Sequence, residues 1–229
     1  MKIIQLFTFI LISILPLLGT AQNAALPQKN SDIPAQAEAQ KKFWSDAYKA
    51  AEAYFAQPSP ENAEKFFMAL PDKQLPHLDA DGELRLINFV FDNDGIGKAR
   101  NFSILIKSME KGEPEAVDLG FRLINISDGL AGEGLCYFLG RIVDKYPRLF
   151  LQKLLVHQSK TEPSVLELLD SILHPVAWWE QQNDEAGYPE LLKKRLDIRI
   201  KALESVNDND LKEIRDRCLT ILKNRVPRS

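Results

Sequence analysis

The stretch 77–95 carries two short acidic turns of a kind that can bind a cation or a phosphate. Both turns have the form Asp-x-Asp-Gly, at 79–82 and at 92–95. A calcium-binding EF-hand loop supplies oxygen ligands at positions 1, 3, 5 and 12, with glycine at position 6. When the first turn is aligned with positions 3 to 6, His77 falls at position 1 and Asn88 at position 12. Because two carboxylate ligands are missing, we expect no calcium site here.

The segment 94–100, with the sequence DGIGKAR, is the one place where a phosphate-binding loop comes into question. A P-loop needs four residues between its first glycine and the Gly-Lys pair, and then Ser or Thr. Here only Ile96 separates the glycines, and Ala99 follows Lys98. We therefore interpret both acidic turns as helix boundaries, the first opening a helix and the second ending it.

Histidine and cysteine could supply metal ligands or nucleophiles, but their spacing does not favour either role. His77, His157 and His174 lie far apart in the sequence, so a zinc site would require all three to converge. We expect them to be exposed or singly bonded at helix ends. Cys136 and Cys218 lie in apolar helical stripes, where a buried thiol or a disulfide are both open. No Gly-x-Ser-x-Gly elbow occurs, and we expect no catalytic residue, cofactor or metal.

The segment 174–190, HPVAWWEQQNDEAGYPE, contains an adjacent tryptophan pair followed by a polar and acidic run. Neighbouring residues of a helix point about 100° apart, so one face does not readily bury both rings. Exposed aromatic residues beside polar ones are typical of interfaces and sugar-stacking platforms. We therefore predict a partner-binding surface made of Trp178, Trp179, Glu180 and Tyr188. The alternative is that the tryptophans close the core at a helix end.

The charge distribution is uneven along the chain. The full chain has a net charge of −3, which does not indicate a nucleic-acid-binding protein. The segment 189–229 is locally basic, with eleven Lys or Arg and seven Asp or Glu. Most such charge forms a solvated helix face, and a patch for an acidic partner is the less favoured interpretation.

The N-terminus has the pattern of a secretory signal peptide. Lys2 precedes an apolar run over 3–18, and small residues follow at 19–21. The run is short for a membrane span, which needs about 20 residues, although an uncleaved anchor is the alternative. We predict a signal peptide over 1–21, a flexible spacer over 22–33 and a single domain over 34–229. The mature protein is then periplasmic or extracellular, with no stable membrane span.

The elements that must position these residues are helical. Between 130 and 146 the apolar residues recur with the period of an α-helix, and no segment alternates with period two. Gly112 is a candidate helix C-cap. Prolines that suit a first helical turn precede several amphipathic runs, at Pro60, Pro114, Pro147, Pro163 and Pro189. The pattern predicts an all-α fold of stacked antiparallel helical hairpins, either an irregular α-solenoid or a helical bundle.

Two segments resemble known kinds of helical protein. The helix pair at 113–127 and 128–147 resembles one hairpin of a HEAT-like α-solenoid, and the segment 144–155, DKYPRLFLQKLL, resembles exported bacterial helical proteins of uncharacterised function. The resemblance implies a protein of the bacterial envelope. We expect a non-catalytic binding or scaffold protein whose partner is another envelope protein. The alternative is a helical hydrolase or lyase that acts on envelope glycans, which would require two acidic side chains in a cleft near the tryptophan pair.

Overall fold

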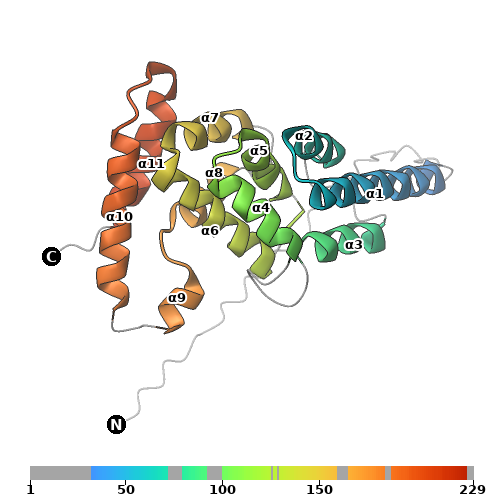
Figure 1. Cartoon of the computed structure of the whole chain (residues 1–229), viewed down its shortest axis with the longest axis horizontal. Coiled ribbons are helices and arrows are strands. Elements are labelled where there is room, and N and C mark those ends of the chain that lie inside the picture. The colour runs from blue at the N-terminus through green and yellow to red at the C-terminus, as the bar shows by residue number, and fades with distance from the viewer. Residues whose placement is uncertain are drawn as a thin grey trace, which may run out of the picture.

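The computed structural model describes residues 32–71, 79–91, 100–124, 126–127, 129–158, 165–183 and 187–225. Within these ranges the chain folds into eleven α-helices and one short 3₁₀ helix without any strand, so the predicted all-α class is confirmed (Figure 1). The predicted signal peptide lies outside the described residues. The first helix begins at Asp32, two residues inside the predicted spacer.

The helices follow one another with short connections. In chain order they are α1 (Asp32–Ala56), α2 (Pro60–Ala69), α3 (Ala80–Phe91), α4 (Arg100–Glu110), α5 (Pro114–Leu123), α6 (Gly129–Lys145), α7 (Pro147–His157), α8 (Val165–Leu173), α9 (Trp178–Asn183), α10 (Tyr188–Glu204), η1 (Asn209–Leu211) and α11 (Lys212–Arg225). None of the described helices combines the length and apolar character needed to cross a bilayer.

The helices follow one another along the long axis of the molecule roughly in chain order. In Figure 1, α1 to α3 lie at one end, α4 to α8 in the middle, and α10 and α11 at the other end. The helices α5 and α6 contact each other, but α5 packs more extensively on α2, and α6 on α8. The reason is that α5 is buried on most of its surface and therefore needs neighbours on several sides. The packing is thus not restricted to consecutive hairpins.

The helix ends follow local rules that the sequence predicts. Ser59 caps α2, because its hydroxyl accepts a hydrogen bond from the backbone N–H of Asn62 at 3.2 Å. Gly112 ends α4 with a φ of +76°, and the backbone bonds there form a Schellman motif. Three prolines stand at the first position of their helices and one at the second position of α10, namely Pro60, Pro114, Pro147 and Pro189. Pro163 lies outside the described residues.

The first acidic turn opens α3, as predicted. The carboxylate of Asp79 accepts a hydrogen bond from the backbone N–H of Gly82 at 3.2 Å. The backbone carbonyl of Asp79 accepts a second one from the backbone N–H of Glu83. Asp79 is therefore the capping residue, satisfying an N–H that has no partner inside the helix. The second acidic turn lies outside the described residues.

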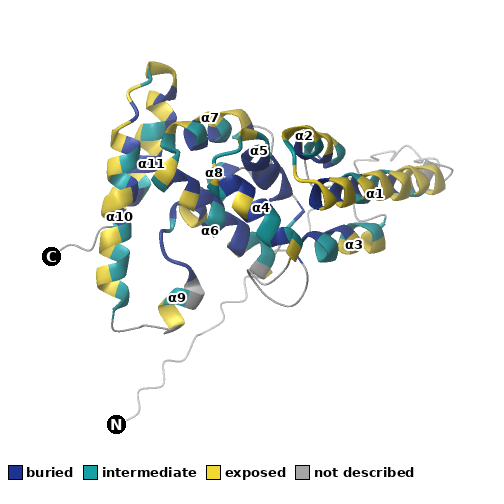
Figure 2. Ribbon diagram, viewed as in Figure 1, coloured by how far each residue is buried: buried dark blue, intermediate teal, exposed yellow. Residues whose placement is uncertain are grey.

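The core is a continuous cluster of aliphatic and aromatic side chains that runs through the middle of the molecule (Figure 2). The predicted stripe of α6 is buried at Leu135, Leu139, Ile142 and Val143. Cys136 and Cys218 are both buried and both free. Of the two possibilities open from the sequence, the structure has two buried thiols.

Candidate binding site at α9

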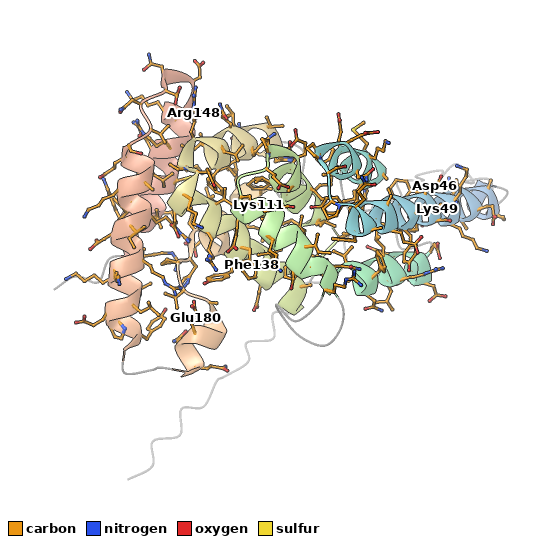
Figure 3. The ribbon with its side chains drawn as sticks, in the orientation of Figure 1. Asp46, Lys49, Lys111, Phe138, Arg148 and Glu180 are labelled. Carbon is orange, nitrogen blue, oxygen red and sulfur yellow. The ribbon has the colours of Figure 1, made fainter. Side chains whose placement is uncertain are left out.

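The predicted surface residues are brought to one region by α9 and the start of α10. Trp178 and Trp179 occupy the first two positions of α9, and their side chains lie outside the described part of the structure. Tyr188 is half-buried at the first position of α10. Glu180 follows the tryptophans directly and faces the interior between α9 and α10 (Figure 3). The exposure of the tryptophan rings stays a prediction.

Glu180 fastens α9 to the rest of the fold. Its two carboxylate oxygens accept a bidentate pair of hydrogen bonds from Arg195 of α10, at 2.7 and 2.8 Å. The hydroxyl of Tyr137 on α6 donates to the same carboxylate at 3.2 Å. The carboxylate also accepts from the backbone N–H of Ala177 at 3.0 Å, which is the reciprocal half of a capping box. One side chain therefore caps α9 and joins it to two other helices.

The environment of Glu180 keeps its carboxylate ionised. Partial burial acts to raise its pKa, but the hydrogen bonds from Arg195, Ala177 and Tyr137 and the charge of Arg195 outweigh burial and lower the pKa. Bidentate pairs between arginine and carboxylate are also among the strongest hydrogen-bonded contacts in proteins. Glu180 is therefore a structural anion and is poorly suited to donate a proton near neutral pH.

A second arginine holds α10 against the middle of the molecule. The guanidinium of Arg199 is 1% exposed and donates to both oxygens of Asp144 on α6, at 3.0 and 3.3 Å. It also donates to the carbonyl of Leu173, the last residue of α8, at 3.1 Å. Gly140 allows this approach, because a Cβ there would lie within 3.0 Å of Arg199. These contacts hold α6, α8 and α10 together beside α9.

Beside α9 lies a half-open pocket of about 300 Å³ between α6, α8 and the end of α11, which we call the α9 pocket. Its apolar wall comes from Val176 and Ala177, in the connection that leads into α9. Its polar groups come from Glu133, Tyr137, Ser171, His174, Gln181 and Arg225. The volume and the mixed lining are those of a small-molecule or side-chain pocket.

The thiol of Cys136 is poorly suited to act as a nucleophile in this pocket. Burial, and secondarily the nearby charge of Glu133, raises the pKa of Cys136 to about 12. The thiolate is the reactive form of cysteine, and at neutral pH it is almost absent here. Cys136 therefore contributes shape and an apolar surface.

His174 contributes a neutral imidazole to the same pocket. Burial is the largest influence on its pKa and lowers it, while the hydrogen bond to the Val176 carbonyl acts in the opposite direction. Nδ1 lies 2.6 Å from that carbonyl and 3.4 Å from the backbone nitrogen of Val176. The shorter contact decides the tautomer, so Nδ1 carries the proton and Nε2 is a hydrogen-bond acceptor.

The other predicted candidates lie elsewhere. His157 is 1% exposed at the end of α7, where Nε2 lies 3.0 Å from the carboxylate of Asp118, which also pairs with Lys153. His157 lies at a helix end, as expected, but of the two expected states it is not the exposed one, because its ring is buried and stacks on Phe121 in the core. His77 lies outside the described residues. Across the described ranges, no group of three or more His, Cys, Asp or Glu is placed to hold a metal ion.

Several basic side chains of the C-terminal helices make contacts within the molecule. Lys223 pairs with Glu204 at 2.7 Å, and Arg225 pairs with Asp170. Arg215 donates to the Val206 carbonyl. The solvated-face interpretation therefore fits these residues better than a patch for an acidic partner.

No protein-family model, curated protein or solved structure matches the chain.

The sequence alone did not indicate two residues of the site, Tyr137 and Arg195. They meet Glu180 from 43 and 15 residues away, and neither forms a motif with it. The available signal was the period of α10, since Arg195 lies seven residues after Tyr188 and therefore on the same helical face.

Replacing Glu180 with glutamine is expected to loosen α9. Glutamine keeps the size of the side chain but removes the charge that pairs with Arg195, and six residues are too few for a helix to persist alone. The amide of Ala177 should exchange with solvent about tenfold faster. Hydrogen exchange measured residue by residue checks this. Gln182→Ala, at an exposed position of the same helix, is the matched control.

The same contact gives α9 a dependence on pH. The folded pKa of Glu180 lies below its ordinary value of 4.5, so its stabilising effect is complete above that value and disappears as the pH falls further. Protection of the Ala177 amide, corrected for the intrinsic exchange rate, should decrease below about pH 4.5 in the native protein and stay flat in Glu180→Gln. Equal protection in both proteins would contradict the role of Glu180.

Proposed function

We propose that this chain is an exported, non-catalytic binding protein of the bacterial envelope, and that it holds a partner protein at the α9 pocket and the adjoining tryptophan pair. The observation that carries this proposal is that Glu180 caps α9 and pairs with Arg195, which holds α9 in place. A helix held by a polar anchor would give the two adjacent tryptophans at its start a fixed backbone support.

The chemistry of the pocket supports binding more than catalysis. The carboxylate next to the tryptophans is held ionised by Arg195, so it does not provide the general acid that glycoside hydrolysis requires. The pocket thiol is protonated and buried. The other polar groups of the pocket belong to Glu133, Tyr137, Ser171, His174, Gln181 and Arg225. Together with the apolar wall, such groups can orient a bound side chain.

The location in the envelope rests on the N-terminal sequence pattern. If the leader is cleaved after Ala21, the mature protein begins at Gln22. Intact mass measurement of protein recovered from the envelope fraction tests this point directly.

Site-specific photo-crosslinking in the native envelope tests the binding proposal. A photoreactive amino acid is placed at Gln181, which is exposed and lines the α9 pocket, or at Gln182, which is exposed on the same helix but does not line it. We expect one discrete protein adduct at Gln181, with at most a weak one at Gln182. The Trp178→Ala/Trp179→Ala variant, shown to be folded by circular dichroism, should lose the adduct.

Two results would overturn the proposal. Equal adducts at both positions would mean that the pocket makes no specific contact. A glycan adduct at Gln181 without any protein adduct would move the assignment to the polymer-acting alternative.

A further inference from the structure

A second recess, independent of the α9 pocket, lies at the opposite end of the molecule between α1 and α3. This α1–α3 groove has a volume of about 430 Å³, within the range of small-molecule sites. One face of α1 supplies Lys41, Trp44, Tyr48 and Glu52, spaced by three or four residues along the helix. The first turns of α3 supply Asp81 and Arg85 from the other side.

The groove is built around a buried donor. Trp44 is 2% exposed, and its indole N–H has no hydrogen-bond partner in the described part of the chain. The two helices meet closely here, because a Cβ on Gly82 would lie 2.9 Å from the Cβ of Trp44. A buried N–H without a partner is uncommon in native proteins and costs stability. Because Trp44 lines the groove, an unsatisfied and solvent-inaccessible donor belongs to its wall.

Arg85 adds further donors beside an aromatic wall. Its guanidinium lies 4.2 Å from the centre of the Tyr48 ring, and that ring also packs on Phe89 at 4.8 Å between ring centres. Among the described residues, Arg85 makes this ring contact and no ion pair. When a guanidinium stacks on an aromatic ring, its N–H groups point outward, parallel to the ring, and can donate hydrogen bonds to a ligand.

The charges that line the groove select the class of ligand. Three cationic side chains are balanced by three carboxylates, which are Lys41, Lys49 and Arg85 against Glu52, Asp79 and Asp81. Figure 3 shows Lys49 on α1 beside Asp46, with which it pairs at 3.6 Å. An anion would be attracted by the three cationic side chains and repelled by the three carboxylates, and a cation would meet the reverse. A neutral molecule with many hydroxyl groups avoids both penalties, since each hydroxyl donates and accepts.

We propose that the α1–α3 groove is a binding site for a neutral sugar. A sugar oxygen accepts from the Arg85 guanidinium, and sugar hydroxyls donate to Asp81 and Glu52, beside the buried Trp44 indole. The apolar face of the sugar ring lies against Tyr48. This site does not depend on the proposed function of the α9 pocket.

Nuclear magnetic resonance of the tryptophan indoles tests the proposal in the full mature chain. The protein contains three tryptophans, so the Trp44 signal is identified by its absence from the spectrum of Trp44→Phe. The probes are cellotriose and triacetylchitotriose, with succinate and glycylglycine as charged small molecules of the anionic and zwitterionic classes. We expect the Trp44 indole signal to move saturably with at least one trisaccharide below about 10 mM.

Variants of exposed residues then test the contacts without disturbing the core. Asp81→Asn and Arg85→Gln should each weaken sugar binding about tenfold, since each removes a charged hydrogen-bonding partner. Glu64→Gln, at an exposed position on α2 outside the groove, should leave the affinity unchanged. The proposal is overturned if neither trisaccharide moves the Trp44 signal, if only succinate or glycylglycine moves it, or if Glu64→Gln weakens binding as much as the groove variants.

Discussion

Replacing Gly140 with alanine is expected to destabilise the fold by about 3 kcal/mol. Gly140 lies where α6 crosses the end of α8, and an added Cβ would overlap the backbone carbonyl oxygen of Ile172 well inside the 3.0 Å limit for such contacts. It would also approach the guanidinium of Arg199 to 2.9 Å. A backbone carbonyl cannot rotate away as a side chain can, so α8 and α6 must separate. Urea unfolding followed by circular dichroism measures the change.

A glycine in the same helix provides the matched control. A Cβ on Gly132 would make only ordinary contact, with the Ser127 carbonyl 3.5 Å away. Gly132→Ala should be neutral or stabilising by up to about 1 kcal/mol, because alanine is the better helix former. If both variants lost similar stability, close packing at Gly140 would not be the reason.

Replacing Asp144 with alanine is expected to destabilise the protein by about 3 kcal/mol. The change leaves the guanidinium of Arg199, which is 1% exposed, without its carboxylate partner in the interior. An uncompensated buried charge is more harmful than the loss of one contact, because it keeps the desolvation cost without the attraction. The double variant Asp144→Ala/Arg199→Met should recover much of the loss, and a double-mutant cycle by urea unfolding measures the coupling.

A surface ion pair of similar geometry is the control for this prediction. Arg148 pairs with Asp208 at 3.0 Å, but the Arg148 side chain is 65% exposed and the Asp208 side chain 35%, so the arginine is not buried as Arg199 is. Asp208→Ala should therefore cost less than about 1 kcal/mol. A double variant at 144 and 199 no more stable than Asp144→Ala would show that Arg199 matters for its packing rather than for its charge.

The helices and their ends were predictable from the sequence because they depend on neighbouring residues. The period of apolar residues in α6, the prolines at Pro60 and Pro147, and the glycine at Gly112 all act within one or two helical turns. The same holds for the capping turn at Asp79. Local rules of this kind operate before any tertiary contact is known.

The polar contacts that position the candidate site were not predictable in this way. Arg199 meets Asp144 across 55 residues, and both belong to helices whose apolar faces alone were visible in the sequence. Glu180 was proposed as a surface contact, and the structure gives it a role in holding α9. Which charged residue turns inward depends on the crossing of helices, and one sequence does not contain that geometry.

The progressive packing along the long axis has a consequence for cooperativity. The described residues of α1 and α3 share no substantial interface with those of α10 and α11, so each end is stabilised mainly by its nearest neighbours. Each end can therefore open locally while the other stays folded. A ligand in the α1–α3 groove would then protect its own end of the molecule and leave the opening of α9 largely unchanged.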